Sequence, residues 1–109
     1  MHPALAAMLT QTLTHEAYQS QDSYGTPVYG SPRQVPARVE YHPRRVLTAL
    51  GEERTSRARI YVDGDAATLA QPFDLRDRVT LPDGTVPALL EVVPFLDEAG
   101  VLDHWRLTV

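Results

Sequence analysis

The chain has 109 residues, which suits a single domain, and a formal net charge of −4 at pH 7. Phosphate binding depends on clustered cations, so this acidic balance argues against a protein that wraps nucleic acid. No stretch approaches the ~18–20 apolar residues of a membrane-spanning helix, and no basic region precedes the apolar start, so we expect neither a membrane span nor a secretory signal. Cysteine is absent, which excludes disulfides and thiolate metal sites.

The first residues predict a short helix followed by a strand. Pro3 suits a first helical turn, and the alanine-rich residues after it extend the pattern, so residues 1–9 are expected to form an N-terminal arm with a short helix. A helix of this length does not persist alone in water. From Leu9 the pattern alternates, with Leu9, Leu13 and His15 on one face and threonines on the other, which predicts a strand.

Residues 19–36 are predicted to be a long irregular loop, because turn-forming residues cluster there: Gly25, Pro27, Gly30, Pro32 and Pro36. A loop of this length in a small domain usually has a function or docks on another surface. Tyr24 and Tyr29 lie within it. Because tyrosine is costly to leave in water, we expect both side chains to pack on the domain or on a neighbouring subunit.

A half-buried strand is predicted over residues 35–42, with its inward face formed by Val35, Ala37, Val39 and Tyr41. Pro43 ends this strand, and residues 43–57 are expected to form a long charged hairpin or loop before the strand that runs to Val62. The simplest interpretation of residues 43–57 is a solvated hairpin whose ion pairs each contribute only ~0–1 kcal/mol. A functional interpretation is a loop that reaches into a ring lumen or onto a partner.

The clearest turn signal is Pro82-Asp83-Gly84, in which proline fixes φ and glycine supplies a positive φ. It predicts a tight hairpin, followed by a strand over residues 86–94 in which Pro87 lies at an edge or bulge. After a turn, a last strand over residues 101–109 is expected to point Trp105, Leu107 and Val109 inward.

These elements indicate the fold class. About six strands with short connections and no long amphipathic helix favour a mainly β fold. We expect a small antiparallel β-barrel with a short N-terminal helix and long loops, forming a single domain over residues 1–109.

No catalytic or metal-binding pattern stands out. His2, His15, His42 and His104 lack the spacing of a zinc motif, and Asp63-Gly64-Asp65 lacks the further ligands of a calcium loop. The serines have no glycine-flanked nucleophile elbow, and there is no glycine-rich phosphate loop. We therefore expect a protein that is not an enzyme, with no catalytic residue, cofactor or metal site.

The order of motifs resembles one family. Along the chain come Tyr-Gly-x-Pro-x-Tyr-Gly (24–30), Val-x-Ala-Arg-Val-Glu-Tyr (35–41), Ser-Arg-Ala-Arg-Ile-Tyr-Val-Asp-Gly-Asp-Ala (56–66) and Asp-Arg-Val-Thr-Leu-Pro-Asp-Gly-Thr (77–85). In this order they resemble the head-completion, or head–tail connector stopper, proteins of siphophages. The resemblance covers about residues 9–109.

The resemblance implies a structural virion protein of the phage neck, forming a homo-oligomeric ring of about six or twelve copies. Such a ring joins the DNA-filled head to the tail and closes the portal channel after packaging. The implied partners are sister copies, the head–tail adaptor or portal ring, the tail-terminator ring and the genomic double-stranded DNA, with no membrane. The implied location is the head–tail junction of the virion, after assembly in the host cytoplasm.

The family's channel-closing loop corresponds to residues 43–57. This correspondence implies a set of charged side chains near the lumen: Arg44, Arg45, Glu52, Glu53 and Arg54. The N-terminal segment and the loop over residues 19–33 are implied to contact neighbouring subunits or rings, through Leu5, Leu9, Tyr24 and Tyr29.

Two alternatives remain open. One is a tail-terminator or another ring subunit of the same neck, which strand content alone does not separate from a stopper. The other is a small OB-like nucleic-acid-binding barrel, with Tyr41, Tyr61 or Trp105 as stacking platforms. The expected inward direction of Tyr41 and Trp105 and the acidic charge argue against the second alternative.

Overall fold

The computed structural model describes residues 7–48, 50–64 and 72–109. These residues are mainly β, and no helix occurs in the three ranges. The strands are β1 (Gln11–Glu16), β2 (Tyr18–Gln21), β3 (Pro27–Tyr29), β4 (Arg33–Glu40), β5 (Arg44–Leu47), β6 (Glu53–Ser56), β7 (Arg59–Asp63), β8 (Arg78–Thr80), β9 (Glu91–Leu96) and β10 (Leu102–Thr108).

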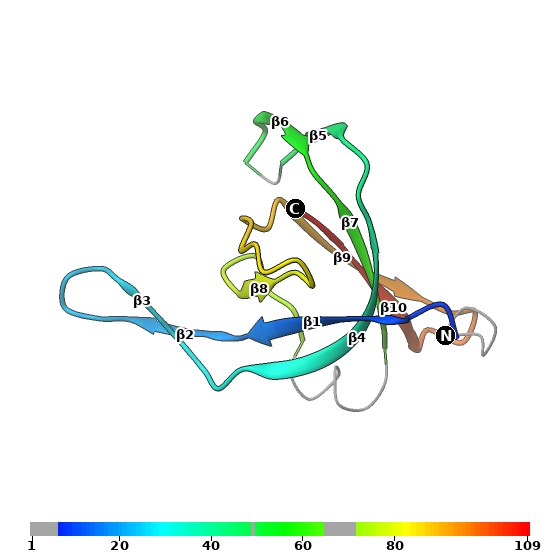
Figure 1. Cartoon of the computed structure of the whole chain (residues 1–109), viewed down its shortest axis with the longest axis horizontal. Helices are drawn as coiled ribbons and strands as arrows, with labels where there is room; N and C mark the ends of the chain where they lie inside the picture. Colours follow the sequence, from blue (N-terminus) through cyan, green and yellow to red (C-terminus); the bar gives the residue numbers. More distant parts are fainter. Residues whose placement is uncertain (1–6, 49, 65–71) are drawn as a thin grey trace.

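Six of these strands form one antiparallel sheet in the order β8-β1-β4-β7-β10-β9. The sheet curls into a half-barrel, with β8 and β9 as its edge strands (Figure 1). The remaining strands pair as two separate ribbons, β2–β3 and β5–β6. The expected mainly β fold with about six sheet strands is thus confirmed as a curled half-barrel.

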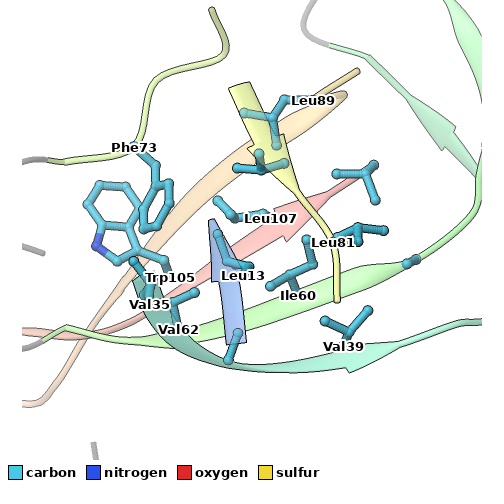
Figure 2. Close-up of a cluster of buried hydrophobic side chains, with 14 residues drawn as sticks. Leu13, Val35, Val39, Ile60, Val62, Phe73, Leu81, Leu89, Trp105 and Leu107 are labelled. Atoms are coloured by element: carbon cyan, nitrogen blue, oxygen red, sulfur yellow. The ribbon is translucent and has the colours of Figure 1, made fainter. Parts of the chain in front are cut away.

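The hydrophobic core lies on the concave side of the sheet, because alternate residues of a strand point to the same face. The buried residues of β1, β4, β7 and β10 follow this period: Leu13, Val35, Ala37, Val39, Ile60, Val62, Trp105 and Leu107. The segment from residue 72 to residue 90 completes the core with Phe73, Val79, Leu81 and Leu89 (Figure 2). Phe73 meets Trp105 edge to face, with 5.7 Å between the ring centroids.

The predicted irregular loop over residues 19–36 is wrong. Instead, β2 and β3 form an antiparallel ribbon in which Tyr18 lies opposite Tyr29 and Gln21 opposite Pro27. Gly25 lies in the turn of this ribbon, Pro27 begins β3, Gly30 and Pro32 lie between β3 and β4, and Pro36 lies within β4. The clustering of turn-forming residues therefore reflects the turn of the ribbon and its connection to β4, not a long irregular loop.

Four turns of the molecule share one geometry. In each, the glycine N–H donates to the carbonyl three residues earlier, and that earlier residue donates to the carbonyl four residues later. The glycines adopt φ of 79° to 88°, a conformation that side chains disfavour: Gly25, Gly51, Gly84 and Gly100. The predicted positive φ at Gly84 is confirmed, and the other three turns follow the same requirement.

Three further expectations differ from the structure. No helix is seen at the N-terminus: residues 7–9 form a turn and coil, and residues 1–6 lie outside the described residues. Tyr41 is 51% exposed rather than inward, because β4 ends at Glu40 and the alternation ends with it. The strand predicted from residue 86 begins only at Glu91. Pro87 lacks an N–H for strand pairing, and the residues between Pro87 and Glu91 lie over the core, where Leu89 is buried.

Pro36 occupies a central strand without leaving a gap in the sheet. The backbone N–H of Val39 points toward β1, where it donates to Gln11 Oε1 at 2.8 Å. Because backbone directions alternate, the nitrogen of Pro36 points toward β7, whose pairing with β4 covers only residues 37–40.

Candidate functional site

Two hairpins project from the half-barrel, and β4 connects to both. The first, residues 18–29, contains β2 and β3 and continues β1 and β4; we call it the tyrosine hairpin. The second, residues 44–56, contains β5 and β6 and continues β4 and β7 from the other end of β4; we call it the charged hairpin. Figure 1 shows them leaving the half-barrel in different directions.

The base of the tyrosine hairpin is fastened by aromatic and arginine side chains. Tyr18 and Tyr29 lie opposite each other and meet edge to face, with 6.4 Å between the ring centroids. The guanidinium carbon of Arg76 lies 4.5 Å from the centroid of the Tyr18 ring, and that of Arg78 lies 4.4 Å from the Tyr29 ring. Each tyrosine is therefore covered by a cation from the segment that precedes or enters β8.

Arg78 is in turn held by Glu16, its cross-strand neighbour in β1. Its Nε donates to Glu16 Oε1 at 3.0 Å and its Nη2 to Oε2 at 2.6 Å, which is a bidentate pair. The hydrogen bond from Arg78 lowers the pKa of Glu16 below its ordinary value. The cation over Tyr29 is thus fixed to the sheet itself.

A fully buried histidine lies at the same junction. His15 Nε2 is 2.6 Å from Asp77 Oδ2, and Arg33 Nε donates to His15 Nδ1 at 2.9 Å. Because Nδ1 accepts a hydrogen bond, the imidazole is neutral and its proton lies on Nε2, facing Asp77. Burial lowers the pKa of His15, against the opposing effect of the hydrogen bond to Asp77.

The Asp77 carboxylate joins this histidine to two backbone positions. Its Oδ1 accepts from the N–H of Tyr18 at 2.8 Å, and its Oδ2 accepts from the N–H of Asp74 at 2.9 Å. The side chains of His15 and Asp77 are 0% and 2% exposed, so neither reaches a substrate from solvent. The pair ties β1, the start of β2 and residues 74–77 together and has a positioning role in the fold.

The tip of the tyrosine hairpin is ordered but exposed. Asp22 Oδ1 accepts from the N–H groups of Tyr24 and Thr26, both at 2.9 Å, which fixes the turn. The Tyr24 side chain at this turn is 92% exposed. Of the two expected positions, Tyr24 does not pack on its own domain, and its packing on a neighbouring subunit stays a prediction; Tyr29 packs on the domain, at the hairpin base.

The charged hairpin is held by ion pairs at its surface. Arg45 Nη1 lies 3.3 Å from Glu53 Oε1, and Arg54 Nη2 lies 3.0 Å from Glu52 Oε2, with all four side chains more than half exposed. Its attachment to the sheet is short: β4 and β5 are separated by residues 41–43, and β6 and β7 by residues 57–58. The predicted charged hairpin is present here, and the side chains expected near a lumen lie together on it.

A groove separates the charged hairpin from the segment that completes the core. It has a volume of about 360 Å³ and is lined mainly by apolar side chains: Leu50, Leu75, Ala88, Leu89 and Leu90. Thr48, Glu52 and Arg54 form its rim on the charged hairpin. A second cleft, which Tyr29 and Arg78 help to line, shares Leu75, Ala88 and Leu89 with the groove, so the two hollows adjoin each other.

The sequence did not single out this groove or the His15–Asp77 pair. Histidine and aspartate lie 62 residues apart, and no local pattern links them. The one sequence signal for the groove is Leu50, an apolar residue at a turn that otherwise carries charge. Of the N-terminal contact residues, Leu9 is half-buried and Leu5 lies outside the described residues.

Of the aromatic residues considered as stacking platforms, Trp105 is buried, Tyr61 is half-buried and Tyr41 is exposed. Trp105 is buried in the core, and the rings on the convex face are already engaged: His104 stacks on Phe95 at 4.7 Å, and Arg106 lies over the same ring at 5.2 Å. Arg106 also pairs with Glu91 at 3.1 Å. Partial burial and the charge of Asp83 raise the pKa of Tyr41 above its ordinary value.

Residues 7–48, 50–64 and 72–109 contain no group of three or more potential metal ligands, and Asp65 of the Asp63-Gly64-Asp65 turn lies outside them. No helix long and apolar enough to cross a membrane occurs in these ranges. Comparison with known protein families and with curated proteins finds no match for the chain.

Proposed function

We propose that this chain is a structural, non-enzymatic subunit that assembles into a ring, and that the ring is the stopper of a phage neck. The observation that carries the proposal is the pair of hairpins at the two ends of β4, each with a large side chain exposed at its turn: Tyr24 on one and Leu50 on the other. A small half-barrel with the tip of one hairpin on one side and the apolar groove beside the other hairpin on another side can bind one neighbour on each side, as a ring requires. The neck location rests on the order of sequence motifs.

In this proposal the charged hairpin closes the channel. It is joined to the sheet through the two short segments 41–43 and 57–58, where a change of a few backbone dihedrals swings the whole hairpin. The N–H groups of Arg57 and Ala58 both point to the carbonyl of Val109, at 2.7 and 3.3 Å, so the second segment has a defined anchor. These features suit an element that takes two positions on a fixed frame.

The charge of the hairpin suits a channel for DNA. Residues 44–56 contain three arginines and two glutamates, a net charge of +1, and two of the arginines are paired within the hairpin. Every phosphate neutralised by a protein adds salt-dependent affinity, so a strongly basic loop would retain the DNA during ejection. A hairpin whose arginines are already compensated blocks the channel by its bulk.

The test shortens the charged hairpin without disturbing the sheet. Val46 lies opposite Arg54, so residues 47–53 can be replaced by the dipeptide Asn-Gly, which forms a two-residue hairpin turn. We expect this variant to assemble and to bind DNA-filled heads that lack tails, but to release their DNA. Nuclease-accessible DNA and electron microscopy of the heads measure the two outcomes separately.

The matched control shortens the other hairpin. Ser20 lies opposite Val28, so residues 21–27 can be replaced by the same dipeptide. This control is expected to lose ring assembly and therefore head binding. DNA retained by heads carrying the variant lacking residues 47–53 would contradict the closing role. A ring that associates with purified tails and not with heads would identify a tail terminator instead of a stopper.

A further inference from the structure

The groove beside the charged hairpin is an apolar surface without a partner in the isolated chain. Leu50 and Leu75 line it and are 88% and 41% exposed, and the exposed Ala88 lines it with them. Exposed apolar surface that is concave and rimmed by polar side chains is typical of a docking site. The rim here is formed by Glu52 and Arg54, which pair with each other.

The tip of the tyrosine hairpin has the properties of an occupant. Tyr24 is the most exposed of the large hydrophobic side chains in the described residues, at 92%. The two hydrogen bonds to Asp22 hold the backbone around it, so little conformational freedom is lost when the ring is buried. Tyrosine is also a common anchor of protein interfaces, because it buries a large ring while its hydroxyl stays hydrated.

The tip does not occupy the groove of its own chain. The base of the tyrosine hairpin is fixed by Asp77, Arg76 and Arg78, and the hairpin projects away from the half-barrel along the longest axis of the molecule, which is 45 Å against 30 and 29 Å for the others (Figure 1). A groove and a tip that cannot meet within one chain can meet between two.

The two surfaces also carry opposite charge. Within residues 18–29, Asp22 is the sole charged side chain at neutral pH, which gives a net charge of −1. Residues 44–56 have a net charge of +1, from three arginines and two glutamates. Attraction between the negatively charged tyrosine hairpin of one copy and the positively charged hairpin of another favours their encounter. Two tyrosine-hairpin tips, which carry the same charge, repel each other.

We propose that Tyr24 at the tip of one copy docks on the wall of the groove formed by Leu75 and Ala88 of the next copy, so that subunits join head to tail. Because the two surfaces differ, an open chain of subunits keeps one free tip and one free groove at its ends until a ring closes. This proposal names the subunit contact of the ring and rests on the ring-forming part of the proposed function.

Complementation between two variants tests the direction of the contact. Tyr24→Ser removes the tip and keeps the groove, whereas Leu75→Ser spoils the groove and keeps the tip; both side chains are exposed, so both variants are expected to fold. Each variant alone is expected to remain monomeric at concentrations at which the unaltered chain assembles. An equimolar mixture is expected to give a dimer and nothing larger, because one tip and one groove remain, and sedimentation velocity measures the masses.

Cross-linking tests the contact itself, and the absence of cysteine makes it specific. Chains carrying Tyr24→Cys are mixed with chains carrying Ala88→Cys and oxidised. A disulfide-linked heterodimer is expected, whereas pairing Tyr24→Cys with the distant, exposed turn position Val101→Cys is expected to give none. Both variants are judged by non-reducing electrophoresis and mass measurement.

Three results would overturn the head-to-tail contact: an unaltered chain that stays monomeric up to ~1 mM, single variants that still assemble, or a mixture that stays monomeric. The neck proposal fails separately. If the mixture dimerises and the disulfide forms but the ring binds neither heads nor tails, the contact stands and the neck location falls. If the chain seals heads without the disulfide, the neck location stands and this contact falls.

Discussion

The tyrosine hairpin and the charged hairpin are built alike and attached differently. Both are two-stranded ribbons closed by the same turn, with the glycine in a positive φ. The tyrosine hairpin is fastened at its base by two arginines stacked on two tyrosines and by hydrogen bonds to Asp77. The charged hairpin has exposed ion pairs along its length and short non-strand connections at its base.

The difference predicts that the tyrosine hairpin is held more firmly than the charged hairpin. Stability is not uniform across a structure, and a ribbon with few buried contacts opens at lower free energy than one joined to the core. We therefore expect the tyrosine hairpin to keep one orientation, as docking requires, and the charged hairpin to change position at its base. Substitutions and a change of pH that each weaken one attachment should therefore affect the two hairpins unequally.

Removal of the Asp77 carboxylate should have the largest effect. Asp77→Ala leaves His15 Nε2 and the N–H groups of Tyr18 and Asp74 buried without a partner, and we expect a loss of about 3 kcal/mol in the free energy of unfolding. The free energy of unfolding of such a domain is about 5–15 kcal/mol, so the variant should remain folded. Urea denaturation measures the loss. The control Asp97→Ala, at an exposed turn, should lose far less, and equal losses would show that Asp77 is no special attachment.

Tyr18→Leu should have a smaller, local effect. The change keeps an apolar side chain but removes the edge-to-face contact with Tyr29 and the ring beneath Arg76, and we expect about 1 kcal/mol of destabilisation. Hydrogen exchange should become faster for amides in residues 18–29 and stay unchanged in residues 44–56. Faster exchange in both hairpins would contradict the separation of their attachments.

The sequence predicted the sheet much better than the attachments. The alternating sequence pattern alone predicted that Val35, Ala37 and Val39 are buried, because the face to which a strand residue points depends only on its position along the strand. It failed at Tyr41, where the strand had ended, a boundary that local pattern does not mark. The His15–Asp77 pair and the groove join residues from distant segments, and such contacts follow from how the sheet curls, which no spacing in the sequence encodes.

Mild acid should loosen one hairpin and leave the other unchanged. Burial lowers the pKa of His15 below its ordinary value of 6.5, so as the pH falls the unfolded chain takes up this proton before the folded chain does. The contribution of neutral His15 to stability is complete above pH 6.5 and is lost as the pH falls through the folded pKa. The charged groups around the ring are Asp77, Arg33 and Glu16, and protonation removes the bond from Arg33.

Hydrogen exchange at pH 7.5 and at about pH 5.5 measures this effect, once corrected for the intrinsic pH dependence of exchange. Protection should fall in residues 18–29 and not in residues 44–56. In His15→Gln the protection of residues 18–29 should vary less with pH, whereas the exposed control His42→Gln should behave as the unaltered chain does. A pH dependence that persists in His15→Gln would assign it to another group.

The smallest change in the free energy of unfolding is expected for the charged hairpin, because its side chains are exposed. Arg45→Ala breaks the pair with Glu53 at a site where both side chains are largely in water, so the free energy of unfolding should change by less than about 0.5 kcal/mol. The midpoint of urea denaturation checks this value at low and high salt. A loss as large as that of Tyr18→Leu, or one that salt does not alter, would mean that the charged hairpin is held as firmly as the tyrosine hairpin. A firmly held hairpin could not swing at residues 41–43 and 57–58, and channel closure would then need a different moving element.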